Sequence, residues 1–192
     1  MDDKNSDIFE FIMPTIKVNG KDFELSINAS VINAAVDKMA VEINRDYEGM
    51  NPLFLGILNG SFIFAADLIR KITIPCQISF IKYSSYSGTS STKDVKELIG
   101  LNEQINGRHL IIVEDIVDTG LTLDKILLEL KRFNPESVKI ACFSFKKDAF
   151  TKDFKIDYLG ITLPDEFVVG YGLDYDGYGR NLPDIYKLAK SE

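Results

Sequence analysis

Apolar residues along this chain fall into two alternating patterns. Apolar-rich runs occur at 53–58, 110–113 and 138–145, with the length and β-branched content of strands buried on both faces. Stripes of apolar residues at helical spacing occur at about 31–47, 62–72 and 121–133. Because strands and helices alternate after residue 50, the pattern predicts one α/β domain with a mainly parallel central sheet flanked by helices.

Turn and capping signals outline the rest of the chain. Asn19-Gly20 predicts the turn of a small strand pair near the start of the chain. Ser30 is expected to cap the first helix, and Gly49 follows its end. Further strands are expected at about 76–83, at 95–101, and as an edge strand from Phe167 to Tyr171.

Composition and charge narrow the classes of protein that fit. A length of 192 residues with 45% apolar residues suits one domain with a sizeable core. A formal charge of −7 argues against nucleic-acid binding as the main function. Cys76 and Cys142 lie in apolar runs, so we expect buried reduced thiols and a cytoplasmic protein. The polar, acidic start predicts neither a signal peptide nor a membrane segment.

The stretch from residue 110 to 124 carries the strongest chemical signal. Its buried strand leads into three carboxylates, Glu114, Asp115 and Asp118. The next helix begins with a small-residue turn, which consists of Thr119, Gly120, Leu121 and Thr122. Free N–H groups at a helix start suit a phosphate, whereas the carboxylates suit sugar hydroxyls, a divalent cation or a proton in transit. A helix cap would need only one of these residues, so a phosphorylated sugar explains the pattern better.

Three other stretches offer weaker signals. The run LFLGILNGSFIFAADLI repeats the strand–turn–helix pattern without carboxylates, and its amides at 59–61 would suit pyrophosphate. The small polar segment 84–94 is either an ordinary hairpin loop or a lid that closes over a reaction. Lys146 and Lys147 are either a solvated pair or, at the carboxyl end of a strand, ligand contacts.

The stretch at 110–124 resembles the phosphoribosyl-pyrophosphate signature of the type I phosphoribosyltransferases. That signature is an apolar strand, two acidic residues, two apolar residues, and then Asp, Thr, Gly, any residue and Thr. The resemblance implies that phosphoribosyl pyrophosphate is bound by Glu114, Asp115, Asp118, Thr119, Gly120, Leu121 and Thr122. Leu121 would act through its backbone, and Asp118 would also be the catalytic carboxylate that handles the purine proton.

Two further stretches resemble the same family. The family's pyrophosphate loop, often with a cis peptide bond, matches Leu58, Asn59, Gly60 and Ser61. Asn59 replaces a lysine that many members carry, so the contact here would come from backbone groups and other residues. Ser85-Tyr86 matches a pair in the family's flexible catalytic loop, so the resemblance favours a lid at 84–94 that orders when both substrates are bound.

The run PDEFVVGYGLDYDGYGRNLP resembles the hood of hypoxanthine–guanine phosphoribosyltransferases nearly residue for residue. The resemblance implies that Phe167 stacks on the purine and that the Val168 backbone reads the base edge. Asp174 would lie at the purine and bind magnesium, and Arg180 would contact pyrophosphate. Lys146 matches a lysine that reaches the base.

The resemblance as a whole implies the type I phosphoribosyltransferase fold, with a core at about 28–163. A small hood would comprise about 164–192 and part of 1–27. The implied reaction transfers the phosphoribosyl group to hypoxanthine or guanine. It would need Mg²⁺, with Glu114, Asp115 and Asp174 as ligands, and the family resemblance suggests a dimer or tetramer.

Three other function classes fit less well. A receiver-like phosphorylation domain would leave the Thr119–Thr122 turn unexplained, and a redox enzyme would carry GxGxxG after its first strand. A regulator of the same fold that senses nucleotides or binds RNA should carry a basic face. This chain is acidic and keeps Lys146 and Phe167, so we expect an enzyme.

Overall fold

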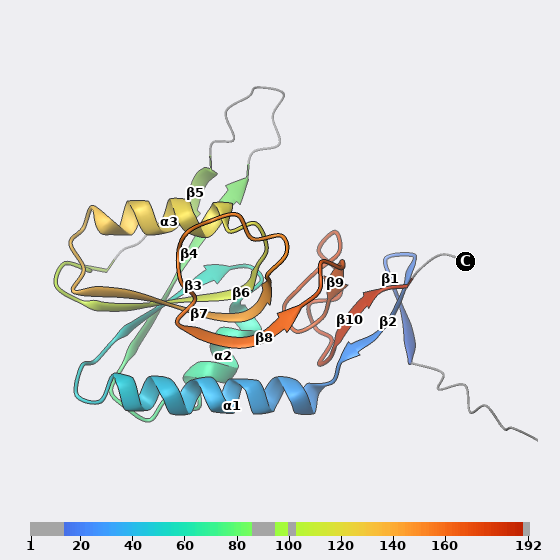
Figure 1. Cartoon of the computed structure of the whole chain (residues 1–192), viewed down its shortest axis with the longest axis horizontal. Helices are drawn as coiled ribbons and strands as arrows, with labels where there is room; N and C mark the ends of the chain where they lie inside the picture. Colours follow the sequence, from blue (N-terminus) through green and yellow to red (C-terminus); the bar gives the residue numbers. More distant parts are fainter. Residues whose placement is uncertain (1–13, 86–94, 100–102, 190–192) are drawn as a thin grey trace, which may run out of the picture.

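The computed structural model describes residues 14–85, 95–99 and 103–189, which form two sheets (Figure 1). The larger has six strands in the order β5-β4-β3-β6-β7-β8. Their bounds are Leu53–Leu58 for β3, Gln77–Ser85 for β4, Val95–Ile99 for β5, His109–Val117 for β6, Ser137–Lys146 for β7 and Tyr158–Leu163 for β8. All neighbours pair in parallel except β5, which runs antiparallel to β4, so the predicted mainly parallel sheet is confirmed.

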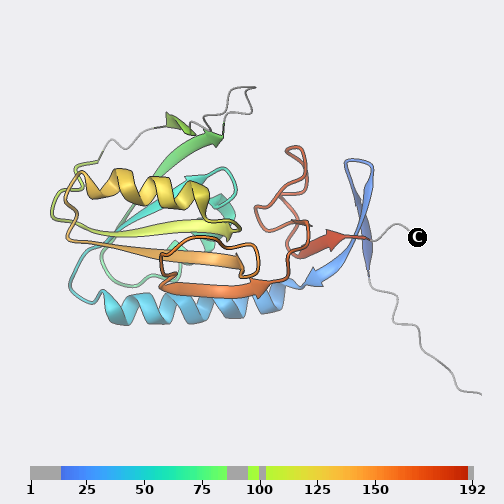
Figure 2. The same ribbon diagram turned by 45° about the horizontal axis from the view of Figure 1, so that its top comes forward.

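Helices cover both faces of this sheet. Helices α1 (Ala29–Asp46) and α2 (Phe62–Ile69) pack on one face, and α3 (Leu121–Lys131) packs on the other (Figure 2). The apolar stripe of α1 buries Ile32, Val36, Met39, Ala40 and Ile43. Within the described part of the chain, no helix is long and apolar enough to cross a membrane.

The smaller sheet lies at one end of the larger one and joins the two ends of the described chain. Its strands run in the order β1-β2-β10-β9 and are antiparallel throughout. They span Thr15–Val18 for β1, Lys21–Ile27 for β2, Val168–Val169 for β9 and Ile185–Leu188 for β10. Phe23, Val169 and Tyr186 are core residues of this sheet. The predicted strand pair is confirmed: Asn19 and Gly20 have φ angles of 44° and 81°, as its tight turn requires.

Several sequence expectations need correction. The cap of α1 is Asn28, whose side chain accepts from the Val31 N–H, and Ser30 instead donates its hydroxyl to Asn28. The expected edge strand from Phe167 to Tyr171 is only Val168–Val169, because Gly170 and Tyr171 turn away with φ angles of 102° and 49°. Strands β8 and β10 were not predicted.

Candidate active site

The loops that follow β3, β6 and β7 meet at one edge of the sheet, because parallel neighbours end on the same side. A cavity of about 110 Å³ opens there, lined by Glu114 and by residues 116–123. Glu114 and Asp118 therefore share one cavity with the predicted phosphate turn, although Glu114 and Asp115 lie within β6 and not in the loop that the sequence predicted. Its floor is the end of β6, and its wall is the first turn of α3.

The first turn of α3 leaves its amides available for an anion. Its cap residue is Gly120, in the left-handed region with a φ of 78°, and no side chain caps the helix. The only side-chain acceptor near these amides is the Thr119 hydroxyl, 3.5 Å from the Leu121 nitrogen, among the residues that the structure describes. The cap residue is Gly120, not Asp118 or Thr119, and the long Thr119 contact satisfies one amide only, so helix capping does not account for this group of residues.

Glu114 and Asp115 are carboxylic acids in an unusually enclosed setting. Burial, followed by the charge of Asp115, raises the pKa of Glu114 well above its usual range. Burial likewise raises the pKa of Asp115 to about 6, although backbone hydrogen bonds and Arg180 act in the other direction. One oxygen of Glu114 is buried and has no hydrogen-bond partner within the described part of the chain. Such groups mark functional sites, where a ligand or ion supplies the missing partner.

The pyrophosphate loop lies directly against this acidic pair. A Cβ at position 60 would overlap the Asp115 carboxylate, so only glycine lets this loop approach the end of β6 so closely. The expected cis peptide bond is present between Leu58 and Asn59. Ser61 faces inward and donates both its hydroxyl and its N–H to the Ile57 carbonyl, at 2.6 Å and 3.4 Å. The predicted anion contacts of this loop are thereby left to Asn59 and Gly60.

The predicted magnesium ligands are compatible with a shared metal site. No group of three metal-binding side chains is preassembled among the described residues. Mg²⁺ in phosphate-binding sites is commonly held by one or two carboxylates together with waters and substrate phosphates. The unpartnered Glu114 oxygen and the adjacent Asp115 fit that requirement. Asp174 already accepts from Arg180 at 2.6 Å and from the Gly177 N–H at 2.7 Å, which orients its carboxylate and leaves lone pairs on both oxygens.

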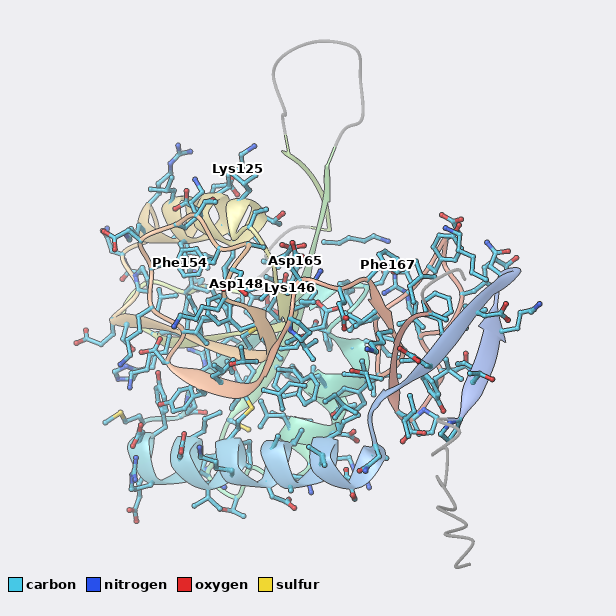
Figure 3. All side chains as sticks on the ribbon, turned by 45° about the vertical axis from the view of Figure 1, so that its right-hand side comes forward. Lys125, Lys146, Asp148, Phe154, Asp165 and Phe167 are labelled. Carbon is cyan, nitrogen blue, oxygen red and sulfur yellow. The ribbon has the colours of Figure 1, made fainter. Side chains whose placement is uncertain are left out.

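Lys146, at the end of β7, reaches into the same edge of the sheet. Its ammonium lies 3.7 Å from Asp118 and 3.3 Å from Asp165, and only 8% of the residue is exposed. Figure 3 shows Lys146 and Asp165 side by side, with Phe167 farther along toward the smaller sheet. The structure thus brings together two predicted residues, Lys146 at the end of β7 and Asp118 directly after β6. Sequence reasoning missed Asp165, whose only signal was a carboxylate two residues before the predicted purine-stacking residue.

Phe167 presents an exposed ring on an aromatic support. The residue is 47% exposed, while Tyr175 meets its ring edge-on at 5.7 Å and Phe23 lies 6.4 Å away. Val168, next in the chain, is buried in β9. An exposed aromatic ring whose position is fixed by contacts with other aromatic rings is suited to stacking on a base. Arg180 donates to the Gly172 carbonyl at 2.6 Å, beside the pyrophosphate loop.

Most of the lid predicted at 84–94 lies outside the described residues. Ser85 is the last residue of β4, and residues 86–94, which include Tyr86, are not described. Both cysteines are free thiols, as expected. Cys142 is buried as predicted, whereas Cys76 is only partly buried.

Comparisons with known proteins identify the family. The family model described as "Phosphoribosyl transferase domain" matches residues 27–176 of this chain. A hypoxanthine-guanine phosphoribosyltransferase of Aquifex aeolicus is 38% identical over 90% of this chain and 98% of its own length. A protein of that name from Lactococcus lactis is 46% identical over 74% of this chain and 78% of its own.

Solved structures agree with the sequence relatives. The crystal structure of a hypoxanthine-guanine phosphoribosyltransferase from Bacillus anthracis has a TM-score of 0.82 and 37% identity, covering 86% of this chain and 98% of that one. A hypoxanthine phosphoribosyltransferase from Staphylococcus aureus has a TM-score of 0.82 and 36% identity, covering 86% and 91%. These findings confirm the predicted type I phosphoribosyltransferase fold. The chain belongs to the phosphoribosyl transferase domain family.

Proposed function

We propose that this protein transfers the 5-phosphoribosyl group of phosphoribosyl pyrophosphate to hypoxanthine or guanine, giving IMP or GMP and pyrophosphate. The observation that carries the proposal is the convergence of two sites at one sheet edge. The phosphate turn at 118–122 lines a cavity, and Lys146 reaches to within 3.7 Å of Asp118 in that turn. A sugar phosphate and a purine would therefore be held next to each other.

The phosphate would be bound by the first turn of α3. The Gly120 cap and the following amides present partial positive charge, and the Thr119 hydroxyl beside the Leu121 N–H could donate to the phosphate as well. Asn59 and Gly60 would hold the pyrophosphate end, which places it against Glu114 and Asp115. Mg²⁺, when bound, would neutralise charge on the departing pyrophosphate.

The purine would be bound by Phe167 and Lys146. Phe167 offers its exposed face for stacking, and the Lys146 ammonium donates to the 6-oxo group of hypoxanthine or guanine. Asp118 would accept the proton that the purine releases when its ring nitrogen attacks C1′ of the ribose. The Lys146 ammonium lies 3.7 Å from the Asp118 carboxylate, so the group that would contact the 6-oxo oxygen and the group that would take the proton are adjacent.

The test is incubation with phosphoribosyl pyrophosphate, Mg²⁺ and each purine base in turn, with IMP or GMP separated and quantified. Lys146→Ala should lose product formation, whereas the exposed neighbour Lys147 provides the matched control variant Lys147→Ala. Absence of any nucleotide product from the unaltered protein would favour the regulatory alternative, which the names of the relatives do not support.

Mg²⁺ dependence, a cytoplasmic location and a dimeric or tetrameric state are part of this proposal. The expectation of Mg²⁺ rests on family membership and on the buried Glu114 carboxylate. The expectations of oligomeric state and location rest on family membership. Activity after chelation and metal replacement tests the ion. Light scattering coupled to size-exclusion chromatography tests the oligomeric state, and cell fractionation tests the location.

A further inference from the structure

The segment that connects β7 to β8 packs against the phosphate turn. Thr151 donates two hydrogen bonds to the Thr119 carbonyl, from its N–H at 3.3 Å and from its hydroxyl at 3.1 Å. The two residues are far apart in sequence, so this contact exists only in the folded chain. We call residues 149–154 the brace.

The contact decides which way the peptide between Thr119 and Gly120 faces. This peptide is trans, so its carbonyl and its N–H point to opposite sides. Thr151 holds the carbonyl on the outer side, and the Gly120 N–H is thereby directed away from the brace. Among the described residues, no acceptor takes a hydrogen bond from that N–H. The peptide is thus oriented as a donor for an incoming anion.

Contacts on either side of Thr151 keep the brace in place. The Phe150 ring lies 2.7 Å from where a Cβ on Gly120 would be, so it covers the outer face of the turn. Phe150 also packs edge-on against Phe145 at 5.2 Å and against Phe154 at 5.0 Å, and Figure 3 shows Phe154 in this connection, away from Phe167. Lys152 pairs with Asp124 in the first turn of α3 at 2.8 Å. The brace is therefore attached to the core and to the helix that would receive the phosphate.

We propose that Thr151 is a positioning residue for binding of the 5′-phosphate of phosphoribosyl pyrophosphate. It acts through the Thr119–Gly120 peptide and does not touch the substrate itself. This inference rests on the proposed function, because it assigns a specific role within the phosphate site. Its consequence is selective: loss of the Thr151 hydroxyl should weaken phosphoribosyl pyrophosphate binding and leave the purine contacts intact.

The test compares Thr151→Val with Thr151→Ser, which restores the hydroxyl. Valine keeps the shape of the side chain but removes the 3.1 Å hydrogen bond to the Thr119 carbonyl. A hydrogen bond of this kind contributes about 1 kcal/mol, so the Kd and KM for phosphoribosyl pyrophosphate should rise about fivefold. The KM for hypoxanthine should stay unchanged, and Thr151→Ser should restore both values. Thr15→Val, at an exposed threonine of β1, is the matched control.

Binding is measured by calorimetry with phosphoribosyl pyrophosphate and Mg²⁺, and the two KM values by steady-state kinetics. Unchanged phosphoribosyl pyrophosphate binding in Thr151→Val would overturn the role of Thr151. Equal losses for both substrates, together with a lower Tm, would overturn it as well, because they indicate a merely structural contact. If the unaltered protein did not bind phosphoribosyl pyrophosphate, the proposed function itself would fail, which is a distinguishable result.

Discussion

The ammonium group of Lys146 lies 3.3 Å from the carboxylate of Asp165, in the loop that follows β8. On its other side, the same ammonium lies 3.7 Å from Asp118. The buried Lys146 ammonium therefore lies between two carboxylates, one of which belongs to Asp118, the residue proposed to accept the purine proton. We expect the ion pair with Asp165 to keep the ammonium from moving toward Asp118.

Asp165→Asn should therefore lower kcat/KM for hypoxanthine about tenfold, which corresponds to about 1.4 kcal/mol of transition-state stabilisation. Without Asp165, the ammonium moves toward Asp118 and leaves the 6-oxo position. The KM for phosphoribosyl pyrophosphate should not change. Asp148→Asn is the control, since Asp148 is an exposed carboxylate close by in Figure 3. Equal kinetics for the two variants would show that Asp165 is not needed to position Lys146.

Asp118→Asn should reduce kcat by about 10²-fold or more, because asparagine keeps the shape of the side chain but cannot accept the purine proton. Affinity for phosphoribosyl pyrophosphate should change little, because the amides of the phosphate turn are unaltered. Single-turnover kinetics measure the effect on the chemical step, and calorimetry measures the affinity for phosphoribosyl pyrophosphate. An asparagine variant with near-normal kcat would remove Asp118 from this role.

Adenine should be a poor substrate, by about 10⁴-fold in kcat/KM relative to hypoxanthine. The Lys146 ammonium is a donor only, and adenine presents an amino group where hypoxanthine presents an acceptor. Stacking on Phe167 does not discriminate between them, because both bases have similar flat faces. The assignment of Lys146 would be wrong if adenine turned over within tenfold of hypoxanthine.

Asp115→Asn should stabilise the protein above pH 6 when neither metal nor substrate is present. The pKa of Asp115 is about 6 in the folded protein, above the value of 3.8 that is usual for aspartate. Between these two values the unfolded chain has released a proton that the folded chain retains, so stability falls as the pH rises through this window. Above pH 6 the folded protein bears the full free-energy cost of ionising buried Asp115, and asparagine, which does not ionise, removes that cost.

Thermal unfolding at a series of pH values measures this effect. At pH 7.5 the Tm of Asp115→Asn should exceed that of the unaltered protein by about 2–4 °C, as expected for about 1 kcal/mol in a chain of this size. The difference should vanish as the pH approaches 4. Asp153→Asn, at an exposed carboxylate, should show no such trend. A constant difference at all pH values would indicate that the charge of Asp115 is not the cause.

The sequence by itself determined the features that depend on neighbours along the chain. Strand β3 was predicted with its observed bounds, Leu53–Leu58, because a buried parallel strand needs a continuous apolar run. The first turn of α3 was predicted because the small residues directly precede the helical apolar pattern. The loop expected for Glu114 and Asp115 was wrong: both lie in β6, which continues to Val117, because backbone pairing with β7 extends past the apolar run. Even here a local ambiguity misled us: Asn28 and Ser30 are both capping residues, and only the folded helix distinguishes them.

Only the tertiary structure decided which distant residues meet. The pairing of β2 with β10 depends on backbone hydrogen bonds between the two ends of the chain, which leave no periodic signal in either segment. The same holds for Asp165 at Lys146 and for Thr151 at the Thr119 carbonyl. These contacts depend on the path of the β7–β8 connection and of the loop after β8. That path results from packing of the whole core, whereas hydrophobic periodicity reports only which face of a single element is buried.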